Sequence, residues 1–146
     1  MVLQLGLLDT NLFIHPLFVR DPQAARCQAL IAAIERGDAE GWIDITVVHE
    51  LTYALRRVPG FSDRAMIHDY IIRILAMPQI LADDKAALIA GLARWATAGV
   101  GFVDAWLAAL AEQRSLPICS VNRRDYPASL DNTFATAKLD LEEECA

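Results

Sequence analysis

An apolar segment that holds a single carboxylate constrains this chain most. Between Val103 and Ala111 the only charged residue is Asp104. Leu107 and Ala108 follow it at three and four positions, the spacing of one helical face, so the pattern predicts a helix that directs Asp104 inward. An inward carboxylate needs a partner, because burying an unpaired charge is costly. For this acid alone, a role as a helix cap or in an arginine pair would be sufficient.

Three further acids occupy similarly apolar contexts. Asp9 follows the apolar run 2–8, and Asp125 follows the apolar run 116–121. Glu50 falls at a position that places it on the apolar face of a predicted helix. Most of the other acids lie in polar turns or at the chain end, with Asp44 the ambiguous one. Four acids in such contexts cannot all be explained as caps.

Short apolar runs alternate with helical patterns along the chain. Runs at 2–8, 41–45 and 116–121 predict strands, the first of them buried. Predicted helices span 21–35, 46–57 with Thr46 as its cap, 62–77 and 83–98, and a last helix carries Asp104 and runs to Ser115. This alternation predicts an α/β sandwich with a mainly parallel sheet flanked by helices.

The four acids could meet at one edge of that sheet. Parallel sheets bind ligands beyond the carboxyl ends of their strands, which is where Asp9 and Asp125 are expected. Four converging carboxylates would repel one another, whereas a hard divalent cation would cancel their charge. Mg²⁺ or Mn²⁺ fits an all-oxygen donor set best. A structural network of salt bridges remains the alternative.

Composition limits the remaining possibilities. The 146 residues, 55% of them hydrophobic, suit a single domain over 1–146, in which about 131–146 would form an edge strand and an acidic tail. No apolar run approaches the length of a membrane span, and we expect a cytoplasmic protein. The net charge of −6 argues against a broad basic face for nucleic acid. The three cysteines are widely spaced and indicate neither a disulfide framework nor a zinc site.

Four segments together resemble a known family. LLDTNLFI, TVVHEL, GFVDAWLAALA and ICSVNRRDYP, in this order, are similar to the PIN-domain ribonucleases, most closely to the VapC-like toxins of prokaryotic toxin–antitoxin pairs. The resemblance covers nearly the whole chain and implies a PIN-like three-layer sandwich that cleaves RNA with divalent metal ions. It also implies that Asp9, Glu50, Asp104 and Asp125 bind the metal.

The last segment departs from the usual pattern, because many relatives carry an acid where this chain has Asn122. We expect Asp125 to contribute more than Asn122, since a carboxylate brings charge that an amide lacks. The polar residues beside the acids are expected to support them by hydrogen bonds, although capping is the simpler account of one of them. These residues are Thr10, Asn11, Thr46 and Ser120.

Two arginine pairs lie near the acids in sequence. Arg123 and Arg124 are candidates for phosphate contacts, whereas a solvated helix end is the simpler interpretation of Arg56 and Arg57.

The resemblance implies RNA as substrate and a small antitoxin as partner. A homodimer is also expected, because one predicted helix and the segment before it carry more apolar positions than one core face uses. These positions are Phe61, Met66, Ile67, Ile71 and Ile72. Two alternatives stay open: a binding module without catalysis, and an aspartyl phosphotransferase with Asp9 as nucleophile. The second lacks an aspartate at the position of Asn11 and a suitably placed lysine.

Overall fold

The computed structural model describes residues 1–118, 120 and 124–126. The strands are β1 Leu3–Leu7, β2 Ala39–Trp42 and β3 Ile80–Leu81. The α-helices are α1 Asn11–Ile14, α2 Ala24–Glu35, α3 Ile45–Ala54, α4 Arg64–Leu75, α5 Lys85–Ala98 and α6 Phe102–Arg114, with short 3₁₀ segments η1 His15–Leu17 and η2 Leu55–Arg57. In this part of the chain no helix has the length and apolarity that crossing a membrane requires.

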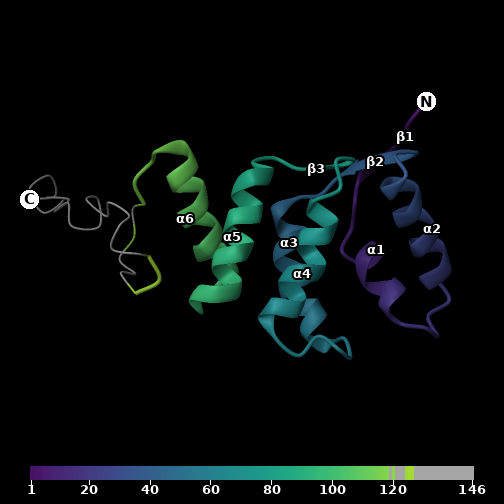
Figure 1. Ribbon diagram of the computed structural model, residues 1–146, viewed down its shortest axis with the longest axis horizontal. Helices are drawn as coiled ribbons and strands as arrows, with labels where there is room; N and C mark the ends of the chain where they lie inside the picture. Colours follow the sequence, from purple (N-terminus) through teal and green to yellow (C-terminus); the bar gives the residue numbers. More distant parts are fainter. Residues whose placement is uncertain (119, 121–123, 127–146) are drawn as a thin grey trace, which may run out of the picture.

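The three strands form one parallel sheet in the order β1-β2-β3. Leu3 pairs with Ala39, and Gly41 pairs with Ile80. Figure 1 shows the strands along one edge of a row of helices, with α1 and α2 at one end, α3 and α4 in the middle, and α5 and α6 at the other end. The predicted α/β class with a parallel sheet flanked by helices is therefore confirmed.

Two predictions about the strands are wrong. β1 is not buried: Leu3 is 58% exposed and Leu7 81% exposed, because β1 is the outer strand of the described sheet and is covered little on its faces. The strand expected at 116–121 does not form in residues 116–118 or at Ser120. The rest of that segment, and the predicted edge strand and tail at 131–146, lie outside the described residues.

The helix that carries Glu50 begins with a cap other than the predicted one. Asp44, not Thr46, is the N-cap of α3, and its carboxylate accepts hydrogen bonds from the Thr46 amide, at 2.9 Å, and from the Thr46 hydroxyl. These bonds lower the pKa of Asp44. The ambiguous acid of the sequence is thus explained by capping.

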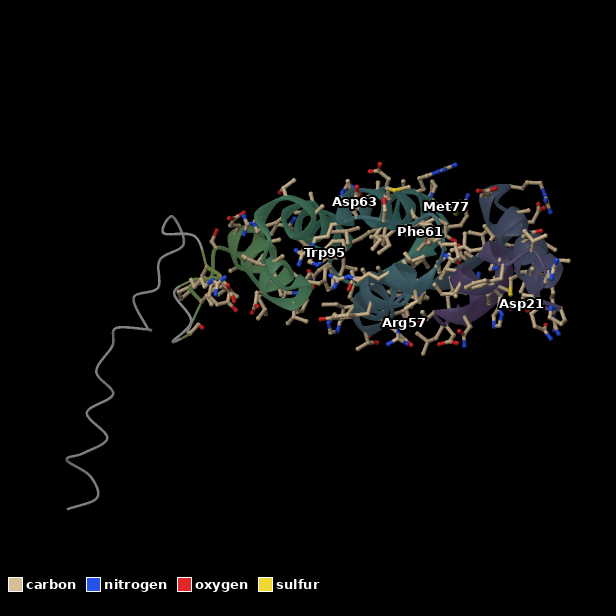
Figure 2. All side chains as sticks on the ribbon, turned by 90° about the horizontal axis from the view of Figure 1, so that it is seen from below. Asp21, Arg57, Phe61, Asp63, Met77 and Trp95 are labelled. Carbon is tan, nitrogen blue, oxygen red and sulfur yellow. The ribbon has the colours of Figure 1, made fainter. Side chains whose placement is uncertain are left out.

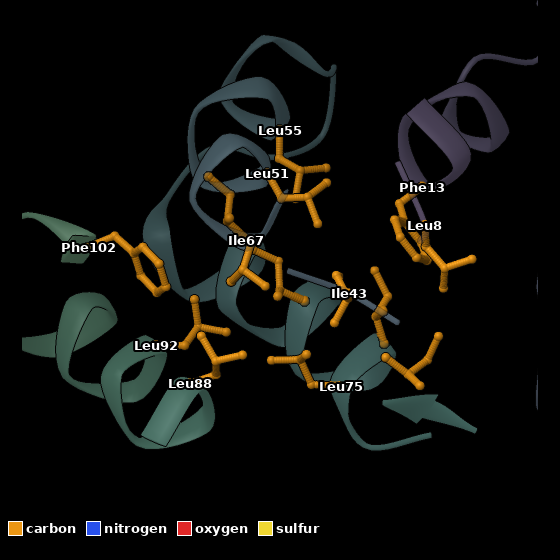
Figure 3. Close-up of a cluster of buried hydrophobic side chains, with 14 of the residues drawn as sticks. Leu8, Phe13, Ile43, Leu51, Leu55, Ile67, Leu75, Leu88, Leu92 and Phe102 are labelled. Carbon is orange, nitrogen blue, oxygen red and sulfur yellow. The ribbon is translucent and has the colours of Figure 1, made fainter. Parts of the chain in front are cut away.

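The hydrophobic core lies between α3, α4 and α5 and extends to the strand ends. Figure 3 shows Leu51 of α3 and Leu55 of η2 facing Ile67 of α4, with Leu88 and Leu92 of α5 below them. All five side chains are at most 1% exposed. This packing supports α3, which carries Glu50, and α5, which precedes the helix that carries Asp104.

The apolar surface expected on α4 is smaller than predicted. Ile67 and Ile71 are buried in the chain's own core, so they cannot contact a second copy. Met66 is 44% exposed, while Phe61 and Ile72 are partly buried. The excess of apolar residues on this helix is therefore largely used by α3 and α5.

Helices α5 and α6 cross at very short range. A Cβ added to Gly91 of α5 would lie 2.7 Å from the Cα of Trp106 in α6. Gly99, with φ of 72°, ends α5 in the left-handed region, so the chain turns at once into α6. The position of Asp104 thus depends on a helix crossing that only glycine permits.

Replacing Gly91 by alanine tests that crossing, because the two possible effects on the free energy of unfolding have opposite signs. Helix propensity alone predicts that Gly91→Ala stabilises α5 by up to about 1 kcal/mol. Because the new methyl would meet backbone, we expect it instead to lower the free energy of unfolding by about 1–3 kcal/mol in urea denaturation. A stabilised variant would contradict the close crossing.

Candidate metal and nucleic-acid site

The first group of site residues lies between β1 and α1. Thr10 is 2% exposed, and its hydroxyl donates a 2.7 Å hydrogen bond to Oε2 of Glu50 in α3. Asp9, the residue before it, is exposed at the end of β1. The Tyr70 hydroxyl donates to the carbonyl of Phe13 at 2.6 Å and so ties α1 to α4. The turn that carries Asp9 is thereby held beside Glu50.

The exposure of Glu50 differs from the prediction. It is an exposed residue of α3 and does not lie on the buried face, which is formed by Val48, Leu51 and Thr52. The Thr10 hydrogen bond occupies Oε2, and no described residue bonds to Oε1. An exposed carboxylate with one fixed oxygen is well suited to a ligand that arrives from solvent.

The second group lies at the start of α6. Asp104 is partly buried in the first turn, where the helix N-terminus favours a negative charge. The Tyr126 hydroxyl donates a 3.1 Å hydrogen bond to Oδ1 of Asp104. Burial of Tyr126 and its bond to Asp104 raise the pKa of the phenol. The predicted inward face of α6 holds in part: Ala108 and Ala111 are buried, but Leu107 is 37% exposed.

Aromatic rings connect the two groups. His49, next to Glu50, stacks on Phe102 with ring centroids 5.9 Å apart and meets the Tyr53 ring edge-on at 5.1 Å. Phe102 begins α6, two residues before Asp104. The imidazole therefore bridges α3 and α6 at the level of the two acids.

A single arginine fixes the loop that leads into α6. Arg64 Nη1 donates to the carbonyl of Trp95 at 2.7 Å and to that of Val100 at 2.8 Å. Its guanidinium also lies 4.9 Å from the centroid of the Trp95 ring. These contacts hold the turn between α5 and α6 against the start of α4.

Comparison with known proteins adds to this geometry. A model of the PIN domain matches residues 6–127, most of the 146-residue chain and a span that includes all four candidate acids. The chain belongs to the PIN-domain family. PIN domains are generally nucleases that use divalent metal ions. Searches of curated proteins and of solved structures gave no match.

The candidate acids of this PIN domain form two groups rather than one closed cluster. Within the described residues, no set of three histidine, cysteine or acidic side chains is close enough to hold one ion. A hydrogen bond between Thr10 and Glu50 defines the first group, and a hydrogen bond between Tyr126 and Asp104 defines the second. Asp125 adjoins Tyr126 in sequence, and its charge contributes to the raised pKa of that phenol.

The other predicted supporting residues have mixed outcomes. Thr46 bonds to Asp44 and not to the candidate acids. Asn11 and Arg124 are exposed, and Ser120 is partly buried at an apolar pocket beside Tyr126. Asn122 and Arg123 lie outside the described residues.

The sequence did not single out Tyr126, Phe102 or Arg64. Tyr126 directly follows Asp125, and Phe102 shares a segment with Asp104, so closeness to candidate acids was the one available signal. Arg64 contacts carbonyls 31 and 36 residues away, which no local pattern indicates.

By the chemistry of its oxygen atoms, though not by the spacing of the described side chains, the donor set of this PIN domain suits a hard divalent cation. Carboxylates of Asp9, Glu50 and Asp104 supply the charged oxygen atoms that Mg²⁺ and Mn²⁺ prefer. Two of them already accept a hydrogen bond from a hydroxyl, the kind of outer support that orients metal-binding carboxylates.

The Tyr126–Asp104 contact predicts a specific titration. In a spectroscopic titration of phenolate absorbance, we expect Tyr126 to ionise above the ordinary value of about 10. Asp104→Asn should lower this pKa part of the way, because it removes the negative charge while the phenol stays buried. Subtracting the Tyr126→Phe titration isolates the signal from that of Tyr70, whose pKa burial raises to about 12. A Tyr126 pKa that Asp104→Asn leaves unchanged would contradict the contact.

Proposed function

We propose that this PIN domain is an endoribonuclease that hydrolyses RNA phosphodiester bonds with Mg²⁺ or Mn²⁺. The Thr10–Glu50 hydrogen bond carries the proposal, because it joins the turn after β1 to α3 and so gathers Asp9 and Glu50 on the accessible side of the molecule. Asp104 lies across the His49–Phe102 contact from them. The family match supplies the general activity.

In this proposal Asp9, Glu50 and Asp104 would hold the cation, with Asp125 as a further negative charge. When bound, the cation would lower the pKa of a water molecule and neutralise charge on the phosphate. Thr10 would keep Oε2 of Glu50 in place and leave Oε1 for the ligand. Tyr126 would act in the same way on Oδ1 of Asp104.

The reaction adds water across a phosphodiester bond. A water oxygen attacks phosphorus, the bond to the 3′ oxygen breaks, and that oxygen takes up a proton. The products that the family resemblance implies are a 5′-phosphate and a 3′-hydroxyl. No covalent bond to the protein is required, which agrees with the proposed role of the carboxylates as ligands of a cation.

The aspartyl phosphotransferase alternative is less well supported. It needs a lysine near Asp9 to stabilise the phosphoryl group. Lys85 instead donates to the carbonyls of Met77 and Ile80, at 2.9 and 2.6 Å, and closes the turn before β3. The other lysine, Lys138, lies outside the described residues.

We further propose that the chain is the toxin of a toxin–antitoxin pair, acts in the cytoplasm and forms a homodimer. Exposed apolar side chains near the acids support a protein partner: Leu107 and Leu116 are 37% and 56% exposed. Both line a pocket of about 280 Å³ that also contains Tyr126. An antitoxin segment seated there would lie beside the residue that contacts Asp104.

The proposed metal site predicts which substitutions abolish cleavage. Glu50→Gln and Asp104→Asn should each reduce RNA cleavage in Mn²⁺ by at least about a hundredfold, because each removes a charged ligand. The temperature at which each variant unfolds should be unchanged or slightly higher, since removing one of several like charges does not destabilise the fold. Gel assays on single-stranded RNA and calorimetric melting measure the two effects.

Glu35→Gln is the matched control, because Glu35 is exposed at the end of α2. It should cleave like the wild type, and a chelator should stop both proteins. Full activity in the presence of chelator, or loss of activity only through unfolding, would refute the proposed metal site.

A further inference from the structure

A pocket with two arginines opens between η2 and the start of α4. Its volume is about 370 Å³, and it is lined by Arg56, Phe61, Ser62, Asp63, Arg64 and Ile67. Figure 2 labels Phe61 and Asp63 of this pocket and Trp95, over which the Arg64 guanidinium lies. The pocket is thus next to the loop that leads to Asp104, because Arg64 also bonds to the Val100 carbonyl.

The pocket is locally positive in a chain whose net charge is −6. Arg56 is exposed, with its guanidinium 5.5 Å from the centroid of the Tyr53 ring. Throughout residues 1–118, 120 and 124–126, no carboxylate forms an ion pair with Arg56 or Arg64. The one carboxylate in the pocket, Asp63, caps α4 by accepting from the Met66 amide at 2.9 Å. Two arginines and one carboxylate therefore line the pocket.

We propose that this pocket binds a backbone phosphate of the RNA strand, outside the bond that is cut. Guanidinium groups match phosphate oxygens in geometry and charge, and phosphate contacts position a strand without reading its sequence. The apolar side of the pocket, formed by Phe61 and Ile67, suits the adjoining ribose. This inference rests on the proposed nuclease function. It implies that the RNA strand runs from the candidate acids to this pocket.

The distance along α3 indicates which phosphate is bound. Arg56 follows Glu50 by six residues, about 9–10 Å along the helical axis and about a third of a turn around it. A stacked strand rises about 3.4 Å per nucleotide, so the bound phosphate lies at least about three nucleotides from the cleaved bond. A strand on this path would pass Tyr53, which lies between Glu50 and Arg56 in sequence and whose ring meets His49 edge-on.

The salt dependence of RNA binding tests the pocket separately from catalysis. The Asp104→Asn protein, in chelator, is titrated with a fluorescent single-stranded oligouridylate at several KCl concentrations. Arg56→Ala in this background should weaken binding about tenfold. It should also reduce the slope of log affinity against log salt by about 0.7, the contribution of one phosphate in a single strand.

Arg73→Ala is the charge-matched control, because Arg73 is exposed near the far end of α4. It should leave the slope within experimental error of the parent. Equal effects of the two substitutions, or no RNA binding by the parent, would overturn the pocket assignment. If the wild type cleaves RNA but Arg56→Ala and Arg73→Ala change binding equally, the pocket assignment fails and the nuclease proposal stands. If only Arg56→Ala changes the slope and the wild type does not cleave RNA, the pocket assignment stands and the nuclease proposal fails.

Discussion

The geometry of the candidate site depends on the Arg64 guanidinium. It donates to the Trp95 and Val100 carbonyls and so fixes the turn between α5 and α6. This turn places Phe102 against His49, which in turn aligns α6 with α3. A guanidinium can do this because it presents several fixed donors in one plane, and the attraction of its charge to the indole ring offsets part of the cost of its desolvation. Together with the close crossing of α5 and α6 at Gly91, this clamp holds Asp104 and Glu50 in a common frame.

Two of the acids are each held by a single hydrogen bond. Each of Glu50 and Asp104 has one oxygen bound by a hydroxyl, from Thr10 and Tyr126 respectively. The helices beneath them are supported by a largely apolar core, so the functional side chains are not required for packing. Exposure also spares Asp9 and Glu50 the cost of burial that their apolar sequence contexts suggested.

Local sequence patterns predicted the elements well and the positions of side chains less well. The helical periodicity that placed α2 to α6 is a property of each segment, and the four acids stood out against apolar neighbours. The edge position of β1 and the exposure of Glu50 depend on which elements cover them, so a segment's own pattern does not contain them. Asp44 and not Thr46 caps α3 because the helix begins at Ile45, one residue before the predicted cap, and the Asp44 carboxylate reaches the Thr46 amide. The Arg64 clamp joins residues more than thirty apart and had no local signal.

The central claim is that Glu50 and Asp104 serve one cation, and a double-mutant cycle of Mn²⁺ binding tests it most directly. Calorimetric titration gives the binding free energy for the wild type, Glu50→Gln, Asp104→Asn and the double variant. A shared ion predicts that the double variant loses less than the sum of the single losses, with a coupling of at least about 1 kcal/mol. Losses that add within about 0.5 kcal/mol would show that the two carboxylates act independently and would contradict a common metal site.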